Sequence, residues 1–362
     1  MMKILGIFRG FPGLGRVVSG VSLLEELRDK YNCEVKAISY LQGKKYLRQR
    51  GFSELQEVSI ADYCSIGLLP TNKMGVYIHS TIKSFEPDLI ILDGEPLILQ
   101  SIKISYPSIK VVVLLNPSDV DNPYNDKEAM DYFNTLYSMA DLAIVHGLRR
   151  TSGTFGYNNI ISIPTILRKE IISYNGNRGN NIYCVLGGGT VNSNQEFIDS
   201  SIRIAELCIE AARSFSDREI HIICSCDIIA SKLYDRTLSS NVIIHENVLS
   251  PNDIYSDAAI IITRSGRNTL SEVAYLGLPT VSFIAGDQYR KEEQHHNINS
   301  LNLPNIQTAT LESSPQELFN KIVKLGSITK TNNCFLPGNR LAINAILNIL
   351  KPNETYKNRF TL

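Results

Sequence analysis

Short apolar runs rich in Ile and Val recur along the chain, and stretches with helical spacing of apolar residues separate them. Runs of this kind are typical of parallel strands that crossover helices cover on both faces. We expect strands at residues 3–8, 34–40, 88–93, 110–115 and 142–146, and again at 181–186, 219–224, 241–245, 258–263 and 279–284. The pattern therefore predicts an α/β protein with two successive doubly wound, Rossmann-like sheets.

The predicted boundary between the two sheets lies in residues 172–181, a segment poor in apolar side chains and rich in Asn and Gly. Such a composition is typical of an exposed linker. We therefore expect a first domain at 1–174, a second domain at 175–350 and a tail at 351–362. Residues 338–350 have the apolar spacing of a helix, which by sequence alone can pack on either domain.

Composition narrows the classes of function. Lys plus Arg and Asp plus Glu both number 36, so the formal net charge is zero and there is no general attraction to nucleic acid or to anionic membranes. The start of the chain lacks a signal-peptide core, and no apolar run approaches the roughly 18 to 20 residues that span a bilayer. The seven Cys are scattered, mostly in apolar runs. This is the pattern of reduced thiols, and we expect a cytoplasmic protein without a nucleic-acid partner.

A glycine-rich turn follows the strand predicted at 181–186. Gly187, Gly188, Gly189 and Thr190 precede an amphipathic helix. Glycines allow a sharp turn and a close approach to a ligand, and the free N–H groups of a helix start attract phosphate. The spacing matches neither the dinucleotide motif nor the Walker motif. On this evidence alone, a phosphate site and a plain tight turn are both open.

A second turn of similar design follows the strand predicted at 258–263. It consists of Arg264, Ser265 and Gly266, and a helix begins at Asn268 and Thr269. Glu272 lies three residues after Thr269, which is capping-box spacing. A carboxylate at this edge of a sheet is also placed to accept hydrogen bonds from ribose hydroxyls. Both interpretations of Glu272 stand, and the ribose contact is favoured by the resemblance that follows.

The region around this turn resembles the donor-binding half of the GT-B glycosyltransferases. It is most similar to the enzymes that add N-acetylglucosamine to the lipid intermediate of peptidoglycan, whose C-terminal domain belongs to glycosyltransferase family 28. The resemblance covers residues 181–310 and rests on RSG-x-x-T-x-x-E, G-L-P and E-Q-x-x-N taken together. It implies a GT-B fold, in which two Rossmann-like domains face each other across a cleft, and a UDP-sugar as donor.

The resemblance also implies roles for individual residues. The loop at Asn247 and Val248 frames the uracil, the Ser265–Thr269 turn meets the diphosphate, Glu272 holds the ribose and Gln294 contacts the donor sugar. The expected donor-binding set is Gly15, Gly188, Gly189, Thr190, Asn247, Val248, Arg264, Ser265, Gly266, Asn268, Thr269, Glu272 and Gln294.

Neither a metal nor a cofactor is expected beside the donor substrate. Fixed N–H dipoles at two helix starts would stabilise the departing diphosphate, and no DxD-type acidic pair stands where a metal-dependent transferase needs one. Cys224 and Cys226 form a C-x-C pair with no second pair to complete a zinc site. We interpret them as core residues.

The first domain departs from the family pattern. Gly13, Leu14 and Gly15 resemble the family's G-x-G-H turn, but Arg16 stands where the relatives carry His. An arginine stays charged and cannot act as a base, so Arg16 is a candidate ligand for a phosphate or an acidic acceptor.

A general base must then come from elsewhere. Asp93 and Glu95 follow the strand at 88–93 and either act as the base, if burial raises the pKa, or brace the next loop. His146, at the end of the strand at 142–146, is a third candidate.

We therefore expect a metal-independent, inverting glycosyltransferase that moves a sugar, preferably an N-acetylhexosamine, from UDP to the hydroxyl of a small-molecule or glycan acceptor. One alternative is a nucleotide-sugar hydrolase on the same scaffold. Another is a non-catalytic nucleotide-sugar-binding protein or subunit, which a donor site without the family His would suit. Several relatives meet a lipid acceptor at a membrane surface, but no basic apolar patch indicates this here.

Overall fold

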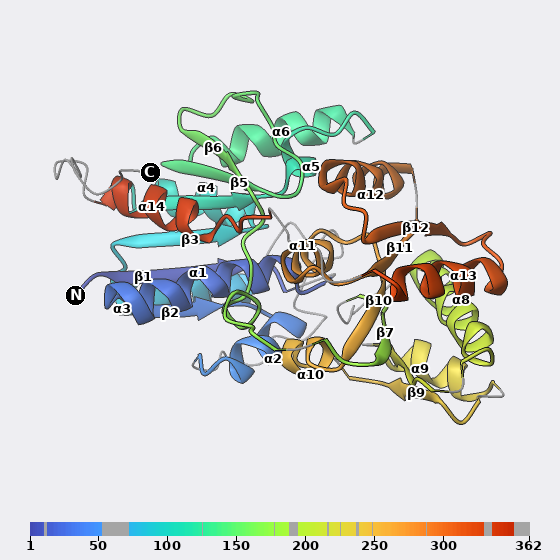
Figure 1. The fold of residues 1–362 in the computed structure, drawn as a ribbon. Coiled ribbons are helices and arrows are strands. Elements are labelled where there is room, and N and C mark those ends of the chain that lie inside the picture. Colours follow the sequence, from blue (N-terminus) through green and yellow to red (C-terminus); the bar gives the residue numbers. More distant parts are fainter. Residues whose placement is uncertain are drawn as a thin grey trace, which may run out of the picture.

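The computed structural model describes residues 1–10, 13–52, 72–124, 126–176, 178–187, 195–215, 217–224, 226–236, 239–247, 249–286, 288–328 and 335–350. Two six-stranded parallel sheets, each with helices on both faces, form the two halves of the molecule (Figure 1). The predicted class, two doubly wound α/β domains, is confirmed. Within the described residues, no helix combines the length and the apolarity needed to cross a bilayer.

The first sheet has the strand order β2-β1-β3-β4-β5-β6. Its strands are β1 (Lys3–Phe8), β2 (Glu34–Ile38), β3 (Leu89–Asp93), β4 (Lys110–Leu115), β5 (Leu142–His146) and β6 (Ile160–Ile163). The helices of this half are α1 (Gly15–Tyr31), α2 (Gln42–Gln49), α3 (Asn72–Phe85), α4 (Pro96–Ser105), α5 (Pro117–Val120) and α6 (Lys127–Tyr137).

Alternate strand residues of this sheet supply two separate cores, which explains the uninterrupted apolar runs. Ile91 and Val112 are buried with the apolar side of α1. Ile90 and Val111 are buried on the opposite face, with residues of α3 and α4.

The second sheet has the strand order β12-β11-β10-β7-β8-β9. Its strands are β7 (Asn181–Val185), β8 (Ile220–Ile223), β9 (Val242–His245), β10 (Ala258–Arg264), β11 (Thr280–Ile284) and β12 (Ile306–Thr310). The remaining helices are α7 (Lys169–Ile172), α8 (Gln195–Ala212), α9 (Asp227–Tyr234), α10 (Pro251–Tyr255), α11 (Arg267–Leu276), α12 (Gln288–Leu301), α13 (Pro315–Gly326) and α14 (Asn339–Leu350).

All ten predicted strands are present, with ends that differ by at most two residues. The sequence pattern missed β6 and β12, each of which lies at one edge of its sheet. Most of their residues are only partly buried, and Gln307 and Thr308 interrupt the apolar character of β12. Because these two strands are only partly covered, their sequences carry a weaker apolar signal than those of the central strands.

The strand order reverses between β1 and β3 in the first sheet and between β7 and β10 in the second. Open α/β sheets bind ligands beyond the carboxyl ends of their strands at such points. The two reversal points meet, because the side-chain amide of Asn268, at the start of α11, donates to the backbone oxygen of Gly15 at 3.2 Å. The switch points of both domains therefore open onto one shared site.

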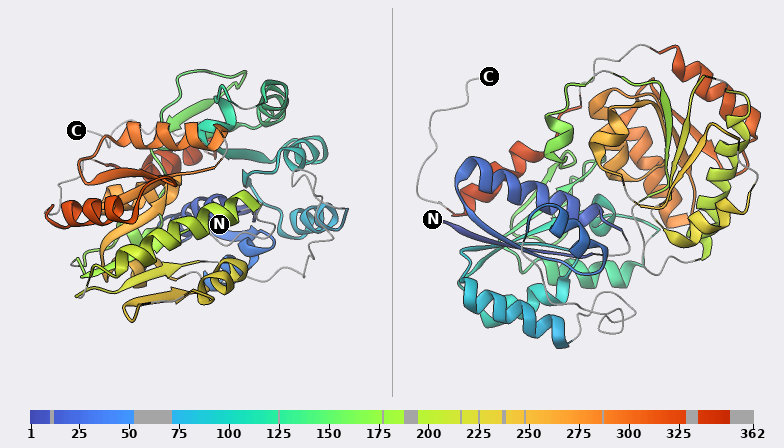
Figure 2. Two further views of the ribbon diagram at one scale, coloured as in Figure 1. Left: turned by 90° about the vertical axis from the view of Figure 1, so that its right-hand side faces the viewer. Right: turned by 90° about the horizontal axis from the view of Figure 1, so that it is seen from below.

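The chain crosses between the halves twice. Leu167 and Ile171 already pack in the core of the second half, ahead of the predicted boundary at 174. Ala342 and Ile346 of α14 pack with α1 in the first half, and Figure 2 shows α14 beside the first-domain helices. The predicted second domain, 175–350, thus contains a helix of the first, because an apolar helix face does not specify which sheet covers it.

The two crossing segments are bound to each other. The backbone N–H of Leu167 donates to Oδ1 of Asn339 and Nδ2 of Asn339 donates to the oxygen of Leu167, both at 2.9 Å. The backbone N–H of Gly338 donates to the oxygen of Thr165 at 2.9 Å. This paired connection joins the two domains directly after the carboxyl end of β6.

Candidate active site

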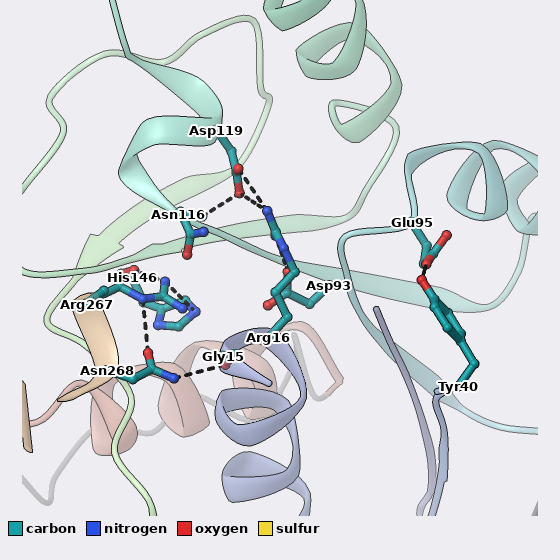
Figure 3. A network of polar contacts seen from close by, with 10 residues as sticks. All are labelled: Gly15, Arg16, Tyr40, Asp93, Glu95, Asn116, Asp119, His146, Arg267 and Asn268. Atoms are coloured by element: carbon teal, nitrogen blue, oxygen red, sulfur yellow. Dashed lines mark hydrogen bonds and ion pairs between the residues drawn. The ribbon is translucent and has the colours of Figure 1, made fainter. Parts of the chain in front are cut away.

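An arginine between two aspartates lies at the carboxyl edge of the first sheet (Figure 3). Nη1 of Arg16, in the first turn of α1, donates to Oδ1 of Asp93 at 2.5 Å. Nη2 of Arg16 donates to both carboxylate oxygens of Asp119, at 2.9 and 3.1 Å. The residue that replaces the family His thus binds one of the predicted base candidates.

Local geometry fixes this cluster. Asp119 belongs to a capping box at the start of α5, where its Oδ2 accepts from the N–H of Asn116 at 2.8 Å. Gly94 has a φ of +85°, and a Cβ there would lie 2.9 Å from Cδ of Arg16. A glycine is therefore needed after Asp93 for the arginine to reach the carboxylate.

The pKa values of the two aspartates are shifted in opposite directions. Asp93 is 1% exposed, and its Oδ2 is buried without a hydrogen-bond partner among the described residues. Burial raises the pKa of Asp93 above its ordinary value, although Arg16 acts in the opposite direction. Burial also opposes ionisation of Asp119, but Arg16 and the Asn116 N–H lower its pKa. Because one guanidinium serves two carboxylates, Asp119 keeps the charge and Asp93 is the one that can take up a proton.

The other two base candidates are engaged elsewhere. Glu95 is buried, and its carboxylate accepts a hydrogen bond from the hydroxyl of Tyr40. This pair lies on the side of Asp93 that faces away from Asp119 (Figure 3). His146 is fully buried, with Nε2 3.3 Å from Nη1 of Arg267. Burial and then the charge of Arg267 lower the pKa of His146 well below its usual value. A neutral imidazole that faces a guanidinium is poorly suited to accept a proton.

The turn after β10 supplies a helix start. Helix α11 begins at Arg267 with Gly266 as its N-cap and no side-chain cap. The proposed capping box between Thr269 and Glu272 is therefore wrong, because both residues lie inside the helix. The backbone N–H groups of the first turn lack intrahelical partners and are suited to an anion. Ser265 does not contribute its hydroxyl, which bonds to Ser282 at 2.6 Å.

Arg264 reaches from the end of β10 to the start of α8. Its Nη1 donates to the hydroxyls of Ser200 and Ser201 at 2.8 and 3.0 Å, and its guanidinium lies over the ring of Phe197. Burial, together with Arg290, lowers the pKa of Arg264 to about 10. The positive charge of Arg264 thus lies beside the first turns of α8.

Not all of the predicted donor-binding residues can be placed beside these two helix starts. Gly188, Gly189, Thr190 and Val248 lie outside the described residues. Gly187, just before them, has a φ of +121°, a backbone conformation that favours glycine. Asn247 is exposed after β9, at the edge of the second sheet.

Glu272, the predicted ribose ligand, is 2% exposed and anchored by two side chains. Nε and Nη2 of Arg168 donate to its two oxygens at 2.7 and 2.5 Å, and the hydroxyl of Tyr255 donates to Oε2 at 2.7 Å. No sequence signal identified Arg168, which precedes α7. The carboxylate is held rigidly, and each oxygen retains lone-pair capacity for a further donor.

Gln294, the predicted sugar ligand, is turned toward the end of β11. Its Oε1 accepts from the N–H of Ala285 at 2.7 Å and its Nε2 donates to the oxygen of Ala285 at 2.8 Å. Its neighbour Glu293 instead lines a small pocket of about 30 Å³ between the domains, together with Arg267 and Asp121. Burial and then Asp119 raise the pKa of Glu293. Sequence reasoning missed Glu293 and Arg267, although both lie inside the quoted motifs.

No group of three or more His, Cys, Asp or Glu side chains that could hold a metal ion occurs among the residues with described placement. Cys224 is buried in the second-domain core, and Cys226 packs against it, as the core interpretation of the pair expects.

Residues 217–333 match the family model of the glycosyltransferase family 28 C-terminal domain. No curated protein gives a match to the chain. MurG of Acinetobacter baumannii is 13% identical and superposes with a TM-score of 0.57 over 96% of this chain and 100% of that one. A putative UDP-N-acetylglucosamine 2-epimerase from Listeria monocytogenes is 12% identical, with a TM-score of 0.65 over the whole of both chains. The predicted GT-B fold and the predicted family-28-like second domain are confirmed.

Proposed function

We propose that this chain, which has the GT-B fold and matches the glycosyltransferase family 28 C-terminal domain over residues 217–333, transfers a sugar from UDP to an acceptor hydroxyl, with inversion and without a metal. The observation that carries the proposal is the carboxylate of Asp93. One oxygen is held by Arg16, and the other is buried without a partner at the switch point that faces the start of α11.

In this mechanism Asp93 is the general base. Its Oδ2 accepts the proton of the acceptor hydroxyl while the hydroxyl oxygen attacks the anomeric carbon from the face opposite the diphosphate. The new carbon–oxygen bond forms as the bond to the β-phosphate breaks, and UDP leaves with the electron pair. Arg16 orients Asp93 and does not contact the reacting atoms.

The leaving diphosphate is stabilised by the second domain. The free N–H groups at the start of α11 and the guanidinium of Arg264 beside the start of α8 supply fixed positive charge where negative charge develops. These groups take the role that a divalent ion has in other transferases. By resemblance, an N-acetylhexosamine is the preferred sugar.

Glu272 is the proposed ribose ligand. We expect Glu272→Gln to weaken UDP binding by about 1 to 3 kcal/mol, since hydrogen bonds to a charged acceptor are lost. Tyr255→Phe is the matched control, because it removes one partner of Glu272 and leaves its charge in place. Isothermal titration with UDP measures both. Equal affinity of wild type and Glu272→Gln would show that the carboxylate serves only to bind Arg168.

The activity is tested by incubating the protein with UDP-N-acetylglucosamine, UDP-glucose or GDP-mannose, each with and without a panel of sugars, oligosaccharides and lipid-linked sugars. We expect UDP to be released only with a UDP-sugar and an acceptor. The product is identified by mass spectrometry, and its anomeric configuration by proton NMR coupling constants. Retention of configuration, or a preference for GDP-mannose, would contradict the proposal.

A reaction without an acceptor is the second candidate, either hydrolysis or isomerisation of the nucleotide sugar. It is favoured by the likeness to 2-epimerases, including that from Neisseria meningitidis bound to UDP-GlcNAc, with a TM-score of 0.64 and 13% identity over 96% of this chain and 100% of that one. Rapid release of UDP without acceptor would favour a hydrolase. A changed sugar spectrum, with deuterium taken up from heavy water, would favour an isomerase.

A further inference from the structure

Two neighbouring residues of α11 bridge the domains (Figure 3). Nη1 of Arg267 donates to the backbone oxygen of His146, at the end of β5, at 2.7 Å. Nε of Arg267 donates to Oδ1 of Asn268 at 3.2 Å, and Nδ2 of Asn268 donates to the oxygen of Gly15 at 3.2 Å. One continuous set of hydrogen bonds therefore links the start of α11 to both β5 and α1.

Arg267 binds a backbone oxygen of the first domain although acidic side chains lie nearby. Asp93 and Asp119 are close enough to affect it electrostatically, and Glu293 lines the same pocket. Even so, the hydrogen bonds found for Arg267 across the cleft go to the main chain and ring of His146. Burial lowers the pKa of Arg267 to about 10, so the guanidinium stays charged at neutral pH. Because Arg267 binds a neutral backbone oxygen of the opposite domain, this hydrogen bond fixes the relative position of the domains and does not neutralise the charge of the guanidinium.

A second link between the domains lies close to Arg267, in the two crossing segments. The amide of Asn339 pairs with the backbone of Leu167 where the chain crosses between the domains. The hydroxyl of Ser271, one turn along α11 from Arg267, donates to the hydroxyl of Thr165 in the first crossing segment at 2.8 Å. The first half of helix α11 is thus held both by the first crossing segment, through Ser271, and by the contacts of Arg267 with the first domain.

We propose that Arg267 and Asn268 form an interdomain latch that holds the start of α11 against the carboxyl edge of the first sheet. Arg267 is a positioning residue, since it sets the separation between the helix start that receives the diphosphate and the carboxylate of Asp93. When the latch releases, the domains separate about the crossing segments. The expected effect on catalysis rests on the proposed function, whereas the expected effect on the separation of the domains does not.

The latch is tested with Arg267→Ala and Arg267→Lys, and with Arg236→Ala as control, because Arg236 is exposed and its ion pair with Glu206 lies within the second domain. Small-angle X-ray scattering of the full chain measures the separation of the domains without ligand. We expect a larger radius of gyration for Arg267→Ala than for wild type and the control. Arg267→Lys, which can still donate to the His146 oxygen, should lie between them.

Measurements of turnover and of UDP affinity distinguish a positioning role of Arg267 from a role in binding the donor. We expect Arg267→Ala to lose about tenfold to hundredfold in kcat, the scale of one hydrogen bond from a charged donor, with the Kd for UDP unchanged. Arg267→Lys should recover part of the loss. If Arg267→Ala does not fold, Arg267→Lys and Asn268→Ala carry the scattering test.

Unchanged scattering and turnover in Arg267→Ala would overturn the latch. A parallel loss of UDP affinity and turnover would also overturn it, because Arg267 would then be a ligand of the donor. If the wild type turns over no nucleotide sugar, the proposed function fails, and the scattering result still decides whether the latch exists.

Discussion

Replacing Asp93 by Asn should strongly lower turnover while leaving the thermal stability of the protein almost unchanged. The variant keeps the size of the side chain and an oxygen that can accept from Arg16, but it cannot take up a proton. We expect turnover to fall by about 100- to 10,000-fold, the usual contribution of a general base. The pH dependence of kcat/KM in the wild type should show an acid limb above the ordinary carboxylate range, since burial raises the pKa of Asp93.

The effect on stability follows from the same burial. A raised pKa means that folding disfavours the ionised form, so this group costs stability as pH rises from about 3.9 toward its folded pKa, and the cost persists at neutral pH. Asn removes that cost. Against it, the bond from Arg16 loses about 1 kcal/mol because its acceptor becomes neutral. We expect the two effects to offset, leaving the Tm within about 4 °C of wild type by calorimetry.

Asp119→Asn is the matched control. The pKa of Asp119 is lowered, so its ionised form stabilises the fold above its unfolded pKa, and that contribution is lost as pH falls through the folded pKa. The variant weakens two bonds from Arg16 and the capping box of α5, and should lose about 1 to 3 kcal/mol. The reasoning is refuted if Asp93→Asn keeps more than about a tenth of the turnover, which is well above the range for loss of a base.

Two further changes test the packing around the site. Arg168→Met leaves the buried carboxylate of Glu272 without its cation, and should lower the free energy of unfolding in urea by about 3 to 5 kcal/mol; a loss below about 1 kcal/mol would show that Tyr255 alone satisfies the carboxylate. Ile346→Ala empties a fully buried site where α14 packs on the first domain, and should cost about 2 to 5 kcal/mol. The exposed Leu341→Ala on the same helix should cost almost nothing, and equal losses from the two would contradict the packing described for α14.

The repeating apolar runs were sufficient to predict both sheets and ten of their strands, because a buried parallel strand needs apolar residues on both faces. The turn from Arg264 to Thr269 could likewise be identified, since a glycine turn before a helix is a local feature. The replacement of the family His by Arg16 was also visible in the sequence. It indicated that a general base had to come from another residue.

The tertiary structure alone decided which charged groups meet. Arg16 and Asp93 are 77 positions apart, and Arg168 and Glu272 are 104 apart. Each pair depends on which strands are neighbours and on how the two domains face each other. Local patterns of hydrophobic and polar residues do not encode these contacts, because they record only whether a side chain is buried and not what buries it. For the same reason the sequence could not assign α14 to the first sheet or direct Gln294 toward Ala285.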